Sequence, residues 1–272
     1  MKKGRTRPSR QGFDAHMRAP SPLLLALEGR AIFEWAACIA AWPLLAQAAR
    51  GDGHPVLVLP GLAASDSSTW PLRRFLEGRG YVVYPWEQGL NCGPREGVVR
   101  KVLAQMRRIQ REHGRKLSLV GWSLGGAMAH ALAVREPQRV RSVITLGSPL
   151  GGNPKASNAW RLFELVSGVR ADDPRLRALM SRSPRVPSTS ILSKSDGIVA
   201  WPMSLVPHTE QSENIQVSAS HLGMGANPAV LWAIADRLAQ AEGQWKTFDR
   251  SGWRSLVYGD PRSANGAGLL AL

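Results

Sequence analysis

The sequence predicts an α/β fold with a mostly parallel central sheet, helices on both faces and a small cap insertion. Two observations predict it. From Pro55 onward, short apolar runs alternate with longer amphipathic stretches, which is typical of βα units. The chain also has 272 residues, 44% of them hydrophobic, which is enough to fill the core of one large domain. This composition argues against a disordered chain.

The first elements of the sheet follow directly from these patterns. Residues 56–59 form a continuous apolar run, which predicts a strand buried on both faces. A helix over 70–77, begun by Ser68 or Thr69, comes next. A second strand is expected over 81–84, because glycines separate this β-branched run from the helix.

A long basic helix is expected over 98–113, since its apolar residues recur at helical spacing and Gly114 can end it. A strand over 117–120 and a helix running to Arg135 follow. The remaining predicted elements are strands at 143–146, 190–192 and 215–217 and a helix over 228–240 that begins at Asn227.

The same patterns divide the chain into regions. Residues 1–22 carry six basic side chains against one acid and are expected to be a basic flexible tail. Residues 23–49 predict an amphipathic N-terminal helix region. The main domain is expected over 54–240, with the cap insertion at 151–187, where Gly, Ser, Pro and Arg interrupt the βα pattern. Residues 241–272 form a C-terminal tail with little periodicity.

The apolar region 23–49 could be a membrane span or the end of a late signal peptide cleaved near Ala48. Glu28, Arg30 and Glu34 favour instead a helix that packs on the domain, because charges are costly inside a bilayer. Contact of this helix and the basic tail with an anionic membrane is the less favoured alternative. The cytoplasm or the inner membrane surface is favoured as the location, and a late signal would give a secreted protein instead.

The net charge of +15 favours anionic partners, although charge concerns association and does not name a substrate. Arginine supplies most of it, which indicates compositional bias as much as selection for binding. Nucleic-acid binding is not expected, because no recognition module accompanies the arginines. Cys38 and Cys92 are too few for a disulfide framework and lack the spacing of a metal site, so we expect ordinary thiols.

The segment Gly121-Trp122-Ser123-Leu124-Gly125 matches the pattern G-x-S-x-G. It lies directly after a predicted buried strand and directly before a predicted helix, which is the context this motif requires. A sharp strand-to-helix turn presents a serine hydroxyl at the tip of a sheet, and the glycines allow the two backbones to approach closely. Ser123 is therefore predicted to be a nucleophile.

From this motif outward, residues 54–240 resemble a bacterial esterase or lipase of the α/β-hydrolase superfamily. Two further segments carry the resemblance. Residues 59–62 (Leu-Pro-Gly-Leu) follow the first strong strand, as the oxyanion loop of that family does, and residues 147–149 (Gly-Ser-Pro) follow the strand after the serine helix. The resemblance implies the α/β-hydrolase fold and a Ser-Asp-His triad in that chain order.

Asp196 is expected to be the acid of this triad, because it lies just past the strand at 190–192, where the family places its carboxylate. Such an acid orients the imidazole and stabilises its cation. Asp172 and Asp173 lie in the insertion, and Asp66 precedes the serine, out of chain order.

His221 is expected to be the base, since it follows the last predicted strand and precedes the last helix. His208 is its rival and lies before that strand. His130 lies on the helix that follows Ser123 and is expected to be structural.

The oxyanion of an acyl-transfer intermediate needs donors already aimed at it. The backbone N–H of Leu124 is the expected first donor, and by resemblance that of Leu62 is the second. Pro60 departs from the family, in which many relatives carry histidine at this point of the loop. Trp122, Trp160 and Phe163 are expected to contact the substrate, the last two from the insertion.

These residues predict a serine hydrolase that cleaves carboxylic esters through an acyl-enzyme intermediate, acting on a small-molecule or lipid ester. Acyl transfer, amide hydrolysis or lactone opening by the same triad is the alternative. A non-catalytic membrane-surface or anion-binding protein on a hydrolase scaffold is the alternative from another class. No metal or organic cofactor is expected, because this chemistry requires none and no phosphate-binding or dinucleotide fingerprint is present.

Overall fold

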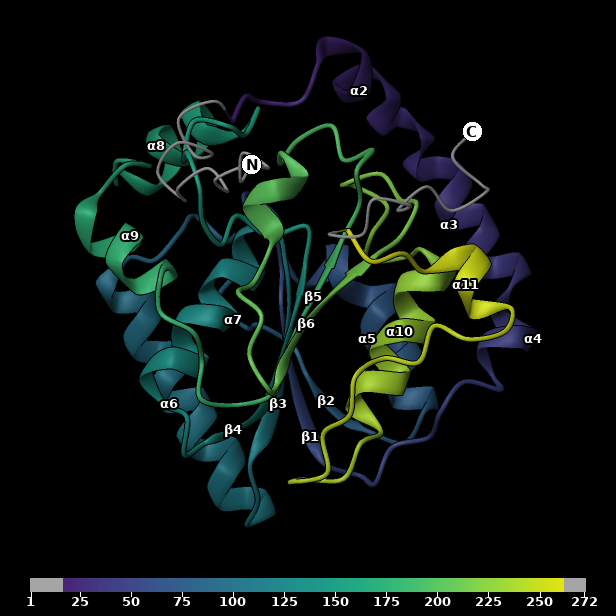
Figure 1. Cartoon of the computed structure of the whole chain (residues 1–272). Coiled ribbons are helices and arrows are strands. Elements are labelled where there is room, and N and C mark those ends of the chain that lie inside the picture. The colour runs from purple at the N-terminus through teal and green to yellow at the C-terminus, as the bar shows by residue number, and fades with distance from the viewer. Residues whose placement is uncertain (1–16, 262–272) are drawn as a thin grey trace, which may run out of the picture.

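The computed structural model describes residues 17–261 and contains one six-stranded, fully parallel sheet (Figure 1). The predicted α/β fold is therefore confirmed. Residues 1–16 of the predicted basic tail and 262–272 of the predicted C-terminal tail lie outside the described residues. In spatial order the strands are β2 (Val82–Tyr84), β1 (Pro55–Leu59), β3 (Leu117–Trp122), β4 (Val140–Leu146), β5 (Ser188–Leu192) and β6 (Ser212–Gln216).

Helices cover both faces of this sheet (Figure 1). The α-helices are α2 (Pro22–Ala26), α3 (Ala31–Ala40), α4 (Trp42–Leu45), α5 (Trp70–Gly78), α6 (Glu96–His113), α7 (Leu124–Arg135), α8 (Trp160–Ser167), α9 (Pro174–Met180), α10 (Pro228–Leu238) and α11 (Arg254–Val257). Three short 3₁₀ turns, η1 (Leu27–Arg30), η2 (Asp66–Thr69) and η3 (Trp201–Ser204), lie between them.

The core consists of two apolar layers, one on each face of the sheet. Because side chains alternate along a strand, Val56 and Val58 of β1 join one layer, with α5 and α10. Leu57 and Leu59 join the other layer, with α6 and α7. The central strands are thus buried on both faces, as the continuous apolar runs predict.

The helix boundaries test the predicted start and stop signals. The side chain of Asn227 accepts hydrogen bonds from two amides of the first turn of α10, and Gly114 ends α6 with a φ of 62°, so both predictions are confirmed. Thr69 is the N-cap residue of α5, as predicted, although its side chain makes no capping hydrogen bond and η2 leads directly into the helix.

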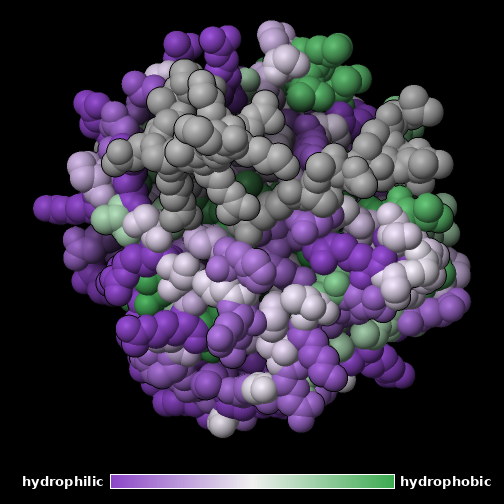
Figure 2. Space-filling view, viewed as in Figure 1, coloured by the Kyte–Doolittle hydropathy of each residue, from purple (hydrophilic) through white to green (hydrophobic). Residues whose placement is uncertain are grey.

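The N-terminal region forms a string of short helices, α2, η1, α3 and α4, in place of the one helix that the apolar pattern suggests. Cys38 and Leu45 of this region are buried in the apolar layer with α10, but its first half also buries a charge. Glu28 is buried, whereas Leu23 and Phe33 are exposed. A hydrophobic area is visible at the upper right of Figure 2, where Figure 1 places α2. Within residues 17–261, no helix is long and apolar enough to cross a membrane.

A buried polar chain lies at the amino end of the strands. His54 Nδ1 lies 2.6 Å from Asp52 Oδ1, and His54 Nε2 lies 2.9 Å from the Ser118 hydroxyl. Arg141 also donates to Asp52 over 2.8 Å. The arrangement resembles a Ser-His-Asp triad, but His54 and Ser118 have no exposed surface, so no substrate can reach them. These hydrogen-bonded side chains therefore hold the amino ends of the strands together.

Acid is expected to destabilise the fold through His54. Burial lowers the pKa of His54 from 6.5 to about 4, against the opposing hydrogen bond with Asp52. The unfolded chain therefore binds a proton between pH 6.5 and 4 that the folded chain does not, and on the order of 3 kcal/mol of stability is lost across that window. Burial also lowers the pKa of His130, which adds to the effect.

Urea unfolding at pH 7.5 and pH 4.5 measures this loss, and His54→Gln is the comparison. The variant is expected to lose less stability than the wild type between the two pH values. Equal losses in both proteins would contradict the role given to His54.

Candidate active site

Ser123 occupies the sharp turn between β3 and α7. Its backbone adopts a φ of 55°, a left-handed value that is strained for a residue with a side chain. A Cβ on Gly121 would lie 2.3 Å from the carbonyl oxygen of Gly125, and one on Gly125 would lie 2.3 Å from that of Leu59. Only glycine fits at both positions, so these two residues allow the turn that presents the hydroxyl at the edge of the sheet.

The structure brings Ser123, His221 and Asp196 together in one hydrogen-bonded chain. His221 Nε2 lies 2.9 Å from Ser123 Oγ, and His221 Nδ1 lies 2.7 Å from Asp196 Oδ2. The three residues follow β3, β6 and β5, whose carboxyl ends meet at one edge because the sheet is parallel. Gly147, which follows β4, leaves the space between them open, because a Cβ there would lie 3.0 Å from the Asp196 carboxylate.

Burial and neighbouring charges together set the pKa of His221. His221 is 2% and Asp196 is 3% exposed. Asp196 Oδ1 accepts hydrogen bonds from the amides of Ile198 and Val199 over 2.8 and 2.7 Å, which fixes the carboxylate and leaves Oδ2 for the imidazole. Burial by itself lowers the pKa of His221, but the charge and hydrogen bond of Asp196, with the charge of Glu28, raise it above its usual 6.5.

The other candidate residues have different partners. The exposed His208 ring hydrogen bonds to the carbonyl of the next residue. Asp66 accepts hydrogen bonds from two amides that follow β2, Asp172 pairs with an exposed arginine, and Asp173 caps α9. His130 bonds to the carbonyl of Arg182, in line with a structural role.

The two expected oxyanion donors lie in suitable backbone positions. Leu124 is the first residue of α7, where amide groups have no partner within the helix. Leu62 lies in the loop after β1, which the buried Asn91 holds in place. The Asn91 side-chain amide donates to the carbonyl of Pro60 over 2.8 Å, and its main chain makes two more hydrogen bonds with residues 63 and 64.

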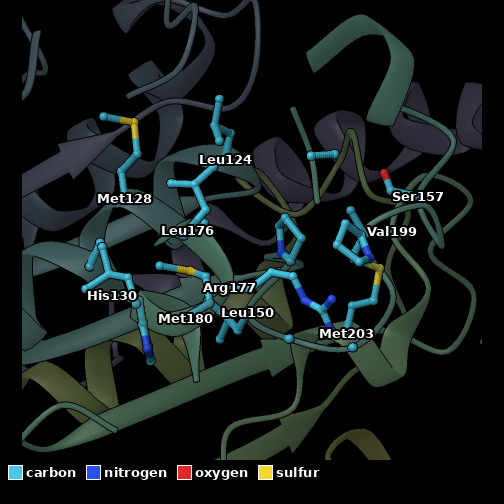
Figure 3. A pocket seen from close by; sticks show the side chains of 18 of the residues that line it. Leu124, Met128, His130, Leu150, Ser157, Leu176, Arg177, Met180, Val199 and Met203 are labelled. Atoms are coloured by element: carbon cyan, nitrogen blue, oxygen red, sulfur yellow. The ribbon is translucent and has the colours of Figure 1, made fainter. Parts of the chain in front are cut away.

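A cavity of about 600 Å³ opens at Ser123. Both Leu62 and Leu124 also line it. Its walls are mainly apolar and come from α7, from the insertion helices α8 and α9, and from the segment after β5. Figure 3 shows Met128 of α7, Met180 of α9 and Met203 after β5 among these side chains. The site therefore joins a serine hydroxyl that is hydrogen bonded to a histidine to a compartment suited to an apolar group.

The expected substrate-contacting residues are divided by the structure. Trp160 and Phe163 of α8 line the cavity. Trp122 is not among the lining residues, and its indole N–H donates to the carbonyl of His221 over 2.9 Å. Its ring packs against Gly61, where a Cβ would lie 3.3 Å away. The structure thus places Trp122 beside the histidine loop and outside the lining of this cavity.

Two residues at this site escaped the sequence analysis as site residues. Asn91 holds the loop after β1, and no pattern in the sequence marks it. Glu28 accepts hydrogen bonds from the amides of Gly197, His221 and Leu222. A charge inside an apolar run was the available signal for Glu28, and it pointed only to the absence of a membrane span. Among residues 17–261, no cluster of three or more His, Cys, Asp or Glu side chains could hold a metal ion.

Comparison with protein families adds to this geometry. A family model described as the alpha/beta hydrolase fold matches residues 42–186, more than half of the chain. No curated protein matches the sequence significantly.

Solved structures with a similar fold include several lipases. Lipase B of Aspergillus fumigatus has a TM-score of 0.54 at 16% identity over 71% of this chain, and the chain spans only 54% of its length. The mature lipase of Bacillus licheniformis has a TM-score of 0.53 at 16% identity, over 71% of this chain and 95% of its own. A metagenome-derived lipolytic enzyme has a TM-score of 0.52 at 17% identity, over 70% of this chain and 93% of its own. At such identities the similarity concerns the fold.

Proposed function

Because the chain belongs to the α/β-hydrolase fold family, we propose that it hydrolyses carboxylic esters through an acyl-enzyme intermediate on Ser123. The observation that carries the proposal is the hydrogen-bonded chain from the Ser123 hydroxyl through His221 to Asp196. A serine hydroxyl becomes a nucleophile only beside a base that can take its proton. His221 is that base, and its hydrogen bond with Asp196 fixes its orientation.

In the acylation step, His221 Nε2 takes the proton of Ser123 as the oxygen attacks the ester carbonyl. Charge develops on the carbonyl oxygen, and the amides of Leu62 and Leu124 are the proposed donors to it. Asp196 stabilises the imidazolium that forms. His221 then gives its proton to the departing alcohol, which leaves the acyl group on Ser123.

Water completes the cycle by the same route. His221 takes a proton from water as its oxygen attacks the acyl-enzyme, and the proton then passes to Ser123 Oγ as the bond to the acid breaks. The apolar cavity beside Ser123 supports a substrate with an apolar acyl chain, since such a chain leaves water on entering it.

Hydrolysis of p-nitrophenyl esters from acetate to palmitate by the full chain tests the proposal. We expect turnover, with kcat/KM rising as the pH increases through the pKa of His221, above 6.5, because only the neutral imidazole accepts the Ser123 proton. A folded protein that cleaves none of these esters would contradict ester hydrolysis.

Filling the cavity is expected to change the chain-length preference. Leu176 of α9 lines the cavity, and Leu176→Trp should lower kcat/KM for a long-chain ester about 10-fold more than for acetate, because the added ring takes space that only the long chain uses. Ala178→Trp, at an exposed position of the same helix outside the lining, is the matched control. Equal effects of Leu176→Trp on both esters would argue against an acyl chain in this cavity.

A further inference from the structure

The N-terminal helices turn their few charges toward the protein. Between Pro22 and Leu45 the only charged residues are Glu28, Arg30 and Glu34. Glu28 is 4% exposed, and the other two are partly buried. Burying a carboxylate is costly unless hydrogen bonds compensate it, so its partners indicate what it does.

The Glu28 carboxylate binds the main chain of both loops that carry Asp196 and His221. Its Oε1 accepts from Gly197 N over 2.7 Å and from His221 N over 3.0 Å, and its Oε2 accepts from Leu222 N over 2.9 Å. One side chain thus connects the amide after the aspartate to the amide of the histidine itself. Hydrogen bonds to a charged acceptor are about twice as strong as neutral ones.

The approach of this segment depends on glycine. A Cβ on Gly197 would lie 2.2 Å from the carbonyl oxygen of Leu24, so only glycine allows α2 to approach the aspartate loop so closely.

Glu34 and Arg30 bind the same loops further from the chemistry. Glu34 accepts from Ser220 N over 2.6 Å, and its second oxygen accepts from the Asn227 side chain over 3.0 Å. Arg30 donates to the carbonyls of Ser195 and Ala219 over 2.7 and 3.0 Å. All three charged residues of the segment therefore contact the histidine and aspartate loops.

We propose that Glu28 is a positioning residue of the active site, whose carboxylate fixes the backbone of Asp196 and His221 relative to each other. The role rests on the proposed hydrolase function. The histidine ring must keep contact with Ser123 and Asp196 at once, and a shift of about 1 Å at such a group can cost about 100-fold in rate. Glu28 also acts on His221 through its charge, which favours the imidazolium together with that of Asp196.

The test compares Glu28→Gln with Glu34→Gln in the full chain, using a soluble p-nitrophenyl ester. Glu28→Gln should lower kcat about 10- to 100-fold with little change in KM, because positioning affects the chemical step. It should also shift the acid limb of kcat/KM to lower pH, because a negative charge near His221 is lost. Glu34→Gln is the control for the acid limb alone, because Glu34 binds the same histidine loop but is not among the charges that raise the pKa of His221.

Glu28→Asp separates the two effects. It keeps the charge but shortens the side chain, so kcat should fall while the acid limb stays near that of the wild type. A Glu28→Gln protein with the kcat and acid limb of the wild type would overturn the proposal, as would equal shifts of the limb in Glu28→Gln and Glu34→Gln. If Glu28→Gln does not fold, an unchanged kcat in folded Glu28→Asp overturns it. An inactive wild type would instead refute the hydrolase function itself.

A second observation, independent of these hydrogen bonds, concerns the outer face of the same helices. Phe33 is 74% and Ile39 is 76% exposed, and this face carries no charged side chain from Pro22 to Leu45. Figure 2 shows part of it as the hydrophobic area over α2. Its large exposed side chains include Leu23, Ile32, Phe33, Ile39, Trp42 and Leu44. Several large apolar side chains exposed on one short run of helices are typical of an interaction site.

We infer that this face docks on an anionic phospholipid bilayer. The charge of the chain supports a lipid partner of that sign, since the protein carries +15 and residues 1–22 hold six basic side chains against one acid. Apolar side chains that enter the interface, together with basic residues that meet anionic headgroups, are the two contributions that hold a peripheral protein on a membrane.

Co-sedimentation with phosphatidylcholine vesicles, with and without 30% phosphatidylserine, tests this surface. We expect binding that requires phosphatidylserine, weakens with salt and falls several-fold in a Phe33→Asp/Ile39→Asp variant. Leu165→Asp on α8, where the leucine is 80% exposed, is the control that should bind as the wild type does. The inference would be overturned if the wild type did not bind, or if the wild type and the double variant bound equally. It would also be overturned if the wild type were a dimer in solution and the double variant a monomer.

Discussion

Replacing Ser123 with alanine is expected to lower kcat for p-nitrophenyl ester hydrolysis by about 10⁵-fold or more while the protein stays folded. In the proposed mechanism the hydroxyl is the attacking group, so its removal prevents the acyl-enzyme from forming. The fold should survive because the substitution keeps Gly121 and Gly125, the two positions of the turn where an added Cβ would clash with a backbone oxygen. Steady-state rates and circular dichroism of both proteins measure the effect.

Ser255→Ala is the matched control for this substitution. The exposed Ser255 hydroxyl donates to the carbonyl of Gly252, and Ser255 does not line the cavity at Ser123, so activity should remain near that of the wild type. A Ser123→Ala protein that keeps even a tenth of wild-type activity would exclude Ser123 as the nucleophile.

The second large effect is expected for Asp196→Asn, with a loss in kcat of about 10⁴-fold. The imidazole Nδ1 lies 2.7 Å from Asp196 Oδ2, and an asparagine N–H in that place would favour the tautomer with its proton on Nε2, which cannot accept the Ser123 proton. The amides of Ile198 and Val199 hold the side chain, so its orientation should survive the change.

Asp172→Asn is the control that separates the triad acid from its rivals in the insertion. Asp172 forms an ion pair with Arg170 at the surface, and its loss should change kcat less than about threefold because exposed ion pairs contribute little. Similar losses in the two variants, or a large loss in His208→Ala, would contradict the assignment of the triad.

The sequence predicted the sheet and the catalytic edge because both rest on local patterns. A strand buried on both faces must be continuously apolar, and a serine at a strand-to-helix turn needs glycines on both sides, so β1, β3 and the turn at Ser123 are recognisable. Asp196 and His221 could then be predicted at the same edge, because each follows the end of a strand and parallel strands end at one edge.

Other parts depend on contacts between distant residues and leave no local pattern. The first half of β6 is polar, and the sequence analysis began this strand three residues too late. Glu213 is buried there because Arg237 of α10 pairs with it over 2.7 Å, and Asn214 is buried because its side chain binds the backbone of Val206. Arg237 lies on another helix and Val206 in the loop before the strand, so neither contact follows from the pattern of the strand itself.

The N-terminal region follows the sequence pattern only in part. Residues 23–49 were expected to bury an apolar face, as amphipathic helices do. Cys38, Leu45 and Ala48 do join the apolar layer with α10, but Glu28 is buried as well, because it meets amides of the histidine and aspartate loops. Only the positions of those loops, almost 170 residues or more away in the sequence, determine which side of the helix faces the protein.

The most direct measurement of the central claim is covalent labelling of the full chain with a fluorophosphonate, which an activated serine attacks with release of fluoride. Intact mass and peptide mapping should show a single adduct on the peptide that contains Ser123, and labelling should slow as the pH falls below the pKa of His221. Ser123→Ala should carry no adduct. An adduct on another residue, or an unlabelled wild type that still cleaves esters, would contradict the account.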